Sequence, residues 1–198
     1  MGSPNFAVPS LRSLTEYFSV VGVVTQPDRP AGRGRKITAP PVKLLAMDLG
    51  IPVIQPRRLS KDQDAMTQLH AWSPDLIVVA AFGQILKSDV LELPAHGCLN
   101  VHGSLLPRWR GAAPLNAAIL HGDRETGITI MKMDAGLDTG PILSQRSMPI
   151  RDDDTAGSLF DKMAELGAEL LVETIPAYLR GELMPEPQDD TLATYAPM

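Results

Sequence analysis

Short apolar runs alternate with amphipathic segments along most of this chain. Two continuous β-branched runs lie at residues 19–25 and 75–81, as is typical of strands covered on both faces. Further apolar or alternating runs predict strands at residues 51–56, 97–102, 126–133 and 141–150. The strands of the first half are separated by helical patterns, which favours an α/β fold with a parallel sheet and right-handed crossovers.

Apolar residues at helical spacing predict the helices of this fold. The first runs through Leu11, Leu14 and Phe18, and the longest covers residues 155–178. Shorter helices are expected at residues 42–50, 60–70, 88–93 and 112–122. We expect Ser60 to cap the helix at residues 60–70. We interpret the acidic, proline-rich end of the chain as an extended connector.

One segment, residues 26–41, is too rich in proline, glycine and basic residues to predict either helix or strand. Between residues 28 and 43, one acidic residue, Asp28, is followed by five basic residues: Arg29, Arg33, Arg35, Lys36 and Lys43. A solvated basic loop is one interpretation. A finger that contacts phosphates and becomes ordered on binding is the other.

Composition narrows the class of protein. The chain has 198 residues, 44% of them hydrophobic, which suits one domain of ordinary globular composition. Its net charge of -5 does not indicate a general nucleic-acid binder, so the basic segment stands out as a local feature. The single cysteine, Cys98, excludes an internal disulfide and fits a reducing, cytoplasmic environment, with its thiol packed in the core. We expect no signal peptide, no membrane span and no zinc site.

The chemistry points to the stretch between residues 98 and 140. Strand alternation places the side chains of Asn100 and His102 on the same side of one strand. A glycine-containing loop at residues 134–140 then supplies two carboxylates, Asp134 and Asp138, with a slight preference for Asp138. Ligands of α/β sheets bind beyond the carboxyl ends of the strands, where this set is expected.

An amide, an imidazole and a carboxylate suit the transfer of an acyl-like carbon to an amine. Asn100 and a protonated His102 can stabilise the oxyanion of a tetrahedral intermediate. Asp138 can orient the imidazole and assist proton removal from the amine, directly or through a water. Because no serine or cysteine nucleophile is needed, we expect direct transfer. The following segment, Ser104–Pro107, either borders a pocket for a flat apolar ligand or packs its leucines into the core, and Trp109 either stacks on a base or packs at a helix entrance.

Several motifs in order resemble the 10-formyltetrahydrofolate-dependent formyltransferase family, and within it the methionyl-tRNA formyltransferases. They cover nearly the whole chain: GSPNFAVPSL, VVGVVTQPDRPAGRGRK, PDLIVVAAFGQIL, NVHGSLLPRWRGAAP, MDAGLDTG and PQDDTLATYAP. The resemblance implies a Rossmann-like domain with a mostly parallel sheet flanked by helices. It also implies a cytoplasmic, monomeric enzyme of translation initiation, with 10-formyltetrahydrofolate as formyl donor, methionyl-tRNA as acceptor and no metal.

The resemblance also implies residue roles. Asn100, His102 and Asp138 match the catalytic set of the family. The residues expected at the folate site are Ser104, Leu105, Leu106 and Pro107, together with Phe82, Gly83, Ile85, Asp134 and Gly136. The basic residues Arg33, Arg35 and Lys36 match an insertion that contacts the tRNA acceptor arm, which favours tRNA over a small ribonucleotide or a sugar amine.

Two parts of the family pattern are expected to be missing. The first strand would end just before the Gly2-Ser3-Pro4 loop, and its loss would leave neighbouring backbone groups without partners. A C-terminal barrel that contacts tRNA would follow. We therefore expect a catalytic domain at residues 1–182 and the start of a linker at residues 183–198. Two alternatives stay open: a formyltransferase for a sugar amine or small metabolite, and a truncated, inactive folate-binding domain.

Overall fold

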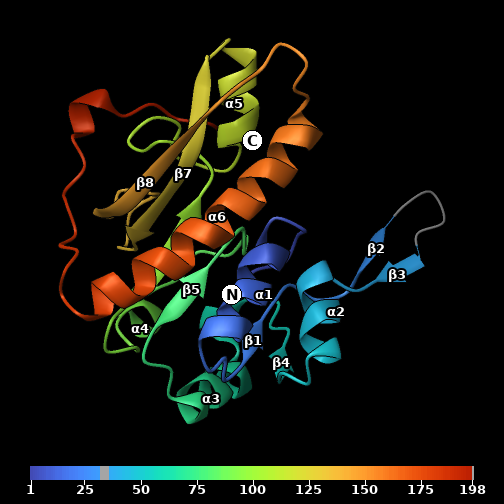
Figure 1. Ribbon diagram of the computed structural model, residues 1–198. Coiled ribbons are helices and arrows are strands. Elements are labelled where there is room, and N and C mark those ends of the chain that lie inside the picture. Colours follow the sequence, from blue (N-terminus) through green and yellow to red (C-terminus); the bar gives the residue numbers. More distant parts are fainter. Residues whose placement is uncertain (32–35, 198) are drawn as a thin grey trace.

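The computed structural model describes residues 1–31 and 36–197 (Figure 1). Its helices are α1 (Ala7–Tyr17), α2 (Pro41–Asp48), α3 (Gln63–Trp72), α4 (Ser88–Leu91), α5 (Pro114–Leu120) and α6 (Ala156–Leu179), with short 3₁₀ turns at Leu59–Lys61 and Asp190–Leu192. Its strands are β1 (Val23–Val24), β2 (Arg29–Ala31), β3 (Lys36–Thr38), β4 (Val53–Ile54), β5 (Ile77–Val79), β6 (Cys98–His102), β7 (Glu125–Lys132) and β8 (Ile142–Pro149). The α/β class predicted from the sequence is confirmed.

The central sheet is mixed. Strands β5 and β6 are parallel, as are β1 and β4, but β7 runs antiparallel to both β6 and β8. The expectation of a mostly parallel sheet therefore holds only for the first half of the chain. The reason lies partly in the connection between β7 and β8, which is too short for the crossover that parallel neighbours require.

The first two residues occupy a strand position between β1 and β5. The Gly2 amide donates to the Val24 carbonyl (3.1 Å), and the Met1 carbonyl accepts from the Ala80 amide (2.9 Å). These bonds connect the β1–β4 pair to the four-stranded sheet. Burial lowers the pKa of the Met1 amino group to about 6.

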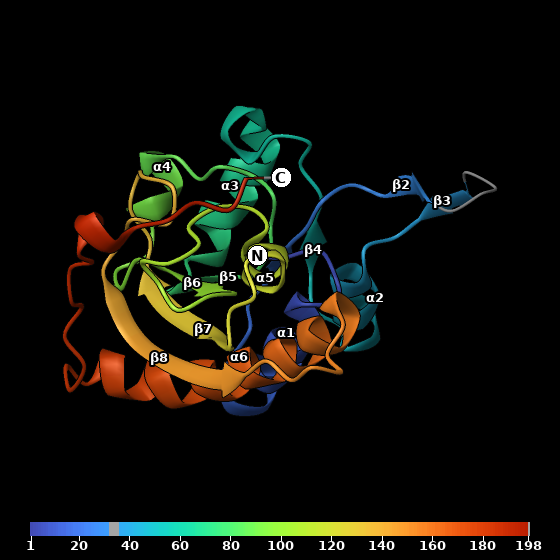
Figure 2. The same ribbon diagram turned by 90° about the horizontal axis from the view of Figure 1, so that it is seen from above.

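Helix α6 covers one face of the sheet and packs beside α1 (Figures 1 and 2). It begins with a capping box in which Thr155 and Ser158 exchange side-chain bonds with each other's backbone amides. A Cβ atom at Gly167 would lie 2.8 Å from Val101 Cγ1, so only glycine allows the helix to approach β6 this closely. The strand that carries the candidate site is therefore packed directly against the longest helix.

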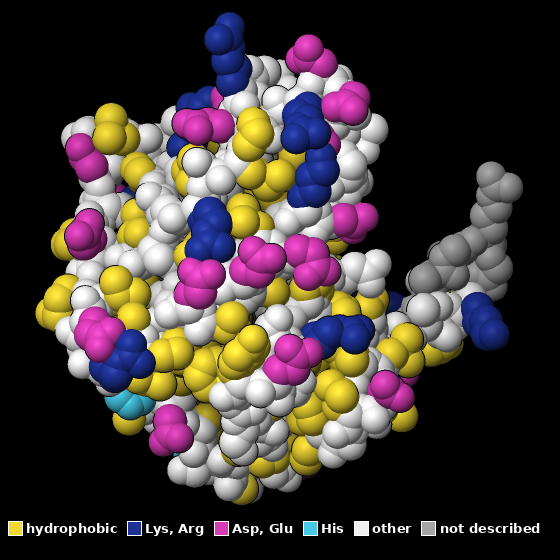
Figure 3. Space-filling model, in the orientation of Figure 1, with side chains coloured by type: hydrophobic (Ala, Val, Ile, Leu, Met, Phe, Trp, Pro, Cys, Tyr) yellow, Lys and Arg dark blue, Asp and Glu magenta, His cyan; other side chains and the backbone are white. Residues whose placement is uncertain are grey.

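The basic segment forms a two-stranded ribbon, so the expectation of no strand there was wrong. Strand β2 pairs antiparallel with β3, and Arg29 lies opposite Thr38. The ribbon projects from the body of the molecule (Figure 2), and a basic side chain stands near its end in Figure 3. A proline within a strand is tolerated at an edge, which is where Pro30 lies in a two-stranded ribbon.

The cap of α3 also differs from the expectation. Ser60 lies within the 3₁₀ turn Leu59–Lys61, and Asp62 is the N-cap, its carboxylate accepting from the Ala65 amide (3.0 Å). Local turn geometry places the N-cap of the helix two residues after Ser60.

Replacing Asp62 with alanine should lower the free energy of unfolding by about 1 kcal/mol, because one N-terminal amide of α3 loses its acceptor. Urea unfolding measures the change, with Ser60→Ala as the control, expected to stay within about 0.5 kcal/mol of the parent. A larger loss for Ser60→Ala than for Asp62→Ala would contradict the assignment of the cap.

Cys98 lies in the core, as expected from its apolar strand, and is 1% exposed. Burial raises the pKa of its thiol from 9.0 to about 12. At a given pH below 9, the folded protein should therefore contain roughly a thousandfold fewer thiolates at this position than the unfolded chain. Iodoacetamide labelling followed by mass spectrometry should show slow modification in buffer and rapid modification in denaturant. Equal rates in the two conditions would show that this part of the core is open.

The end of the chain is extended but attached to the body of the molecule. Glu186 forms an antiparallel bridge with Ile142, and Tyr195 forms a parallel bridge with Arg110. Ala196 is 1% exposed. This segment therefore pairs with the start of β8 and with the loop that contains Arg110, which the interpretation as a connector does not include.

Candidate active site

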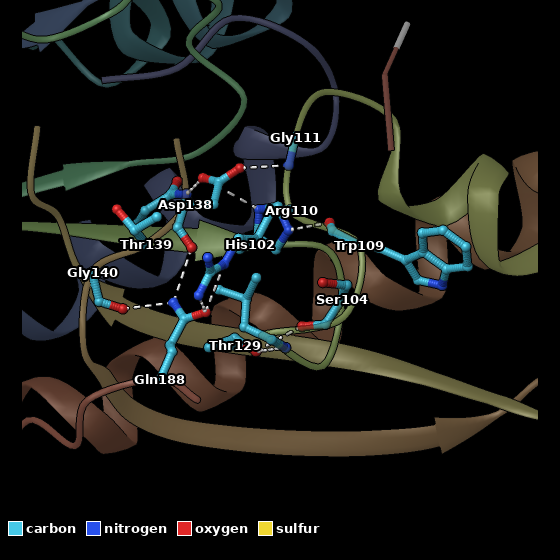
Figure 4. Close-up of polar contacts among 12 residues, drawn as sticks. His102, Ser104, Trp109, Arg110, Gly111, Thr129, Asp138, Thr139, Gly140 and Gln188 are labelled. Atoms are coloured by element: carbon cyan, nitrogen blue, oxygen red, sulfur yellow. Dashed lines mark hydrogen bonds and ion pairs between the residues drawn. The ribbon is translucent and has the colours of Figure 1, made fainter. Parts of the chain in front are cut away.

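The imidazole of His102 is oriented by a backbone carbonyl. His102 is the last residue of β6 and is buried, and its Nε2 lies 3.0 Å from the carbonyl oxygen of Trp109 (Figure 4). A carbonyl can only accept a hydrogen bond, so Nε2 carries the proton. In the neutral ring, Nδ1 is therefore unprotonated and faces the carboxylate of Asp138.

Asp138 lies in the loop between β7 and β8 and has a positive φ of 53°. One carboxylate oxygen, Oδ2, accepts from the Gly111 amide (2.8 Å). The other, Oδ1, lies 3.7 Å from His102 Nδ1 and 3.5 Å from Asn100 Nδ2. Because positive φ is costly for a residue with a Cβ atom, its presence at a carboxylate facing an imidazole is consistent with a functional constraint.

The structure thus brings Asn100, His102 and Asp138 together. It does not give Asp138 the main part in orienting the imidazole, because 3.7 Å exceeds hydrogen-bond length and the Trp109 carbonyl makes the short contact. That detail of the sequence interpretation is corrected.

Asp134 has a different environment. It is exposed, and its Oδ1 accepts from the Gly136 amide (3.0 Å) and from the Thr139 hydroxyl (2.7 Å). This is the local turn bonding expected of an aspartate at a loop. Asp134 therefore shapes the loop, while Asp138 faces the imidazole, in agreement with the slight preference drawn from the sequence.

The segment Ser104–Pro107 is only partly accessible. Ser104 is 1% exposed, and its hydroxyl donates to the Arg108 carbonyl (2.6 Å). Leu106 is 3% exposed, and its backbone bonds to Thr129 Oγ1 and to Gln145 Nε2. Leu105 is half-buried and borders a cavity of about 320 Å³. For Leu106, core packing is the better interpretation, whereas Leu105 reaches a cavity.

That cavity is bordered by Leu105, Arg108, Trp109, Asp123, Arg124, Glu125 and Thr126, and by none of the three clustered side chains. Arg108 donates two bonds to Asp123 (3.0 and 2.6 Å) and holds the pKa of that carboxyl below its usual range. Trp109 packs beneath the Arg108 guanidinium, 4.4 Å from the ring centroid, and its indole donates to Asp123. Trp109 is 7% exposed, which favours packing over stacking on a base.

The other residues expected near folate are divided between core and surface. Phe82 is 2% exposed and lies in the apolar cluster around β5. Gly83, Ile85 and Gly136 are exposed, and Ile85 reaches 86%. An isoleucine this exposed beside Gly83, which has a φ of 75°, is an accessible apolar contact.

Among the basic residues of this segment, the structure describes Arg29, Lys36 and Lys43. Arg33 and Arg35 fall outside the described residues, and Lys36 is exposed at the start of β3. Lys43 forms an ion pair with Asp28 (2.8 Å), and bonds from Gln55 and Lys43 lower the pKa of that carboxyl. The charge of Lys43 is thus balanced within the protein.

Comparison with known sequences identifies the family of this chain. The sequence model of the family described as Formyl transferase matches residues 7–175. This chain belongs to the formyl transferase family. It is 56% identical over 198 residues to the methionyl-tRNA formyltransferase of Myxococcus xanthus, covering all of this chain and 63% of that protein. The corresponding protein of Citrifermentans bemidjiense is 56% identical over 199 residues, with 100% and 62% covered. The chain thus spans less than two thirds of these relatives.

Solved formyl transferases share the fold. Glycinamide ribonucleotide transformylase 1 from Symbiobacterium toebii superimposes with a TM-score of 0.75 at 23% identity, covering 95% of this chain and 91% of that chain. The sugar 3N-formyl transferase WlaRD, crystallised with dTDP and 5-N-formyl-THF, gives a TM-score of 0.73 at 24% identity, with 99% and 67% covered. These likenesses establish the Rossmann-like architecture of the family in this chain.

Three groups that bond to the candidate site residues or their loop escaped the sequence analysis. They are the carbonyl of Trp109, the amide of Gly111 and the side chain of Gln188, which donates to the carbonyls of Asp138 (2.9 Å) and Gly140 (2.7 Å). Two are backbone groups, which every residue has, so no residue type signals them. Gln188 lies in a segment whose composition indicates only a connector.

Within residues 1–31 and 36–197, no three histidine, cysteine, aspartate or glutamate side chains gather as metal ligands would. In the same described ranges, no helix is both long and apolar enough to cross a bilayer.

Proposed function

We propose that this chain is the catalytic part of an enzyme that transfers the formyl group of 10-formyltetrahydrofolate to the α-amino group of methionyl-tRNA. The observation that carries the proposal is the convergence of Asn100, His102 and Asp138 in a chain 56% identical to a methionyl-tRNA formyltransferase. Asp138 Oδ1 lies 3.5 Å from Asn100 Nδ2 and 3.7 Å from His102 Nδ1.

In this proposal the amine nitrogen attacks the formyl carbon and forms the new C–N bond. Asn100 Nδ2 and the protonated Nδ1 of His102 donate to the oxyanion that develops on the formyl oxygen. Nδ1 donates only in the imidazolium form, because Nε2–H already bonds to Trp109. Asp138 takes the proton from the attacking nitrogen, directly or through a water. The bond from the formyl carbon to the folate nitrogen then breaks, and that nitrogen receives a proton as the carbonyl reforms.

Folate contacts follow from exposure. We assign side-chain contacts to Ile85 and Leu105, and backbone contacts to Gly83 and Gly136. The remaining residues of the expected folate set support the walls of this site, since most of them are buried or bonded within the protein. They are Ser104, Leu106, Pro107, Phe82 and Asp134.

The test of the function is formylation of methionyl-tRNA by this chain, with 10-formyltetrahydrofolate as donor and a small amine, methionine methyl ester, as the alternative acceptor. Formyl transfer to methionyl-tRNA at a much higher kcat/KM than to the ester supports the proposal. Transfer to neither acceptor by the folded chain would leave the inactive folate-binding alternative.

The basic ribbon offers a prediction about the substrate. Replacing Arg33, Arg35 and Lys36 together with alanine should raise the KM for methionyl-tRNA about tenfold and reduce the slope of log affinity against log salt by about 2 to 3, since each phosphate contact contributes about 0.7 to 0.9. The measurement is initial rate at several salt concentrations.

The control removes three exposed cations elsewhere, Arg12, Lys87 and Arg151, and should leave the slope nearly unchanged. Equal effects of the two triple variants would show that the ribbon does not contact tRNA. They would favour a small amine as acceptor.

A further inference from the structure

The amide of Gln188 joins two parts of the site that are far apart in sequence. Its Nε2 donates to the carbonyls of Asp138 (2.9 Å) and Gly140 (2.7 Å), and its Oε1 accepts from Arg110 Nε (3.0 Å) and Nη2 (2.8 Å) (Figure 4). Both hydrogens and both acceptor positions of the amide are thereby used. The reversed amide would place its oxygen against two carbonyls, so only this orientation fits.

Arg110 holds Gln188 from the core side. Its side chain is 2% exposed, and its Nη2 also donates to Asp190 Oδ1 (2.7 Å). Burial lowers the pKa of Arg110, but its interactions with Asp190 and Tyr195 together outweigh burial and raise the pKa overall. The Arg110 backbone bonds to the Thr194 carbonyl and the Ala196 amide, each at 2.8 Å. A buried guanidinium is costly without hydrogen-bond partners. The final segment of the chain supplies these partners for Arg110 through Gln188 and Asp190.

The residues on either side of Arg110 bond to the candidate catalytic side chains. The Trp109 carbonyl accepts from His102, and the Gly111 amide donates to Asp138. Gln188 therefore connects the segment that orients His102 to the loop that carries Asp138. No bond is made by Gln188 to His102 or Asn100 among the described contacts of its side chain.

The Asp138 loop needs such a support. Asp138 has a φ of 53°, a conformation that costs on the order of 1 kcal/mol for a residue with a Cβ atom. A Cβ at Gly140 would lie 1.8 Å from the Lys132 carbonyl oxygen, so the backbone runs unusually close to β7 there. The two carbonyls that Gln188 binds flank this constrained stretch, and each would lose its side-chain donor without it.

We propose that Gln188 is a positioning residue, which holds the Asp138 loop so that the carboxylate faces His102 and Asn100. The proposal rests on the proposed function, in which Asp138 accepts the proton of the attacking amine. Gln188 acts through Asp138 and does not contact the substrates. The segment around residue 188 is thus part of the catalytic domain rather than only a connector.

The test uses Gln188→Glu. Glutamate keeps the size of the side chain and the bonds from Arg110, so the attachment of the final segment is retained. It cannot donate to the carbonyls of Asp138 and Gly140. We expect kcat for formyl transfer to fall about 10- to 100-fold with KM values for both substrates nearly unchanged, since small misplacements of a reacting group cost this much. Gln68→Glu, an exposed change of the same kind on α3, is the matched control.

Two further readouts separate positioning from general destabilisation. In an Asp138→Asn background, Gln188→Glu should lower kcat little further, because the group it positions is already lost. Hydrogen–deuterium exchange in residues 134–140 should become faster in Gln188→Glu and stay unchanged in Gln68→Glu.

Unchanged exchange in that loop would overturn the proposal, and so would multiplicative losses of kcat in the double variant. The exchange measurement does not depend on turnover. If the parent chain fails to formylate methionyl-tRNA, the proposed function fails, while exchange still decides whether Gln188 holds the loop.

Discussion

Replacing His102 with alanine should lower kcat/KM for formyl transfer to methionyl-tRNA by about 10²- to 10⁴-fold, the range typical of losing a positioned acid–base or oxyanion group. In its imidazolium form the ring presents an Nδ1 donor beside the Asp138 carboxylate, close to Asn100 Nδ2, and alanine supplies none. Initial rates at saturating 10-formyltetrahydrofolate measure the loss.

The matched control is His70→Ala, which removes an exposed imidazole from α3. Its rate should equal that of the parent. Because His102 is buried, its alanine variant is first compared with the parent by thermal unfolding, and Asp138→Asn provides a second test that keeps side-chain volume. Activity within twofold of the parent in both folded variants would refute the assigned chemistry.

Replacing Leu99 with alanine should lower the free energy of unfolding by about 2–5 kcal/mol. Leu99 is 0% exposed and lies in the main apolar cluster, on the strand that carries Asn100 and His102. The substitution removes buried methyl groups and leaves a cavity in a region packed on all sides. Urea unfolding monitored by circular dichroism measures the difference.

Leu120→Ala is the control, because Leu120 is 83% exposed and the same atoms are removed from the surface. We expect a change within about 0.5 kcal/mol there. Similar losses in the two variants would mean that β6 is not at the centre of the core, and that the site it carries is less rigid than the packing indicates.

Local patterns in the sequence predicted most of the elements and part of the site. The buried strand at residues 97–102 was expected from its apolar run, and α6 from its helical spacing. Strand alternation alone placed Asn100 and His102 on one face, because successive side chains of a strand point in opposite directions. These predictions succeeded because each depends on residues within one element.

Errors arose where neighbouring residues compete or where partners are distant. Ser60 and Asp62 are both good helix caps, and the 3₁₀ turn that contains Ser60 leaves Asp62 as the cap. The basic segment contains Pro30 and yet forms a strand. In a two-stranded ribbon each strand has one edge that pairs with no neighbour, so the backbone N–H that proline lacks is not needed there. Composition reports neither the turn geometry nor the pairing.

By itself, the sequence determined the α/β class, the identity of the candidate catalytic residues and the resemblance to formyltransferases. Only the tertiary structure decided how those residues are held. The Trp109 carbonyl orients His102, the Gly111 amide binds Asp138, and Gln188 reaches the Asp138 loop from 50 residues away. The physical reason is that backbone groups are common to all residues and a glutamine amide suits many partners. Their roles depend on which distant segments the fold brings within hydrogen-bond distance.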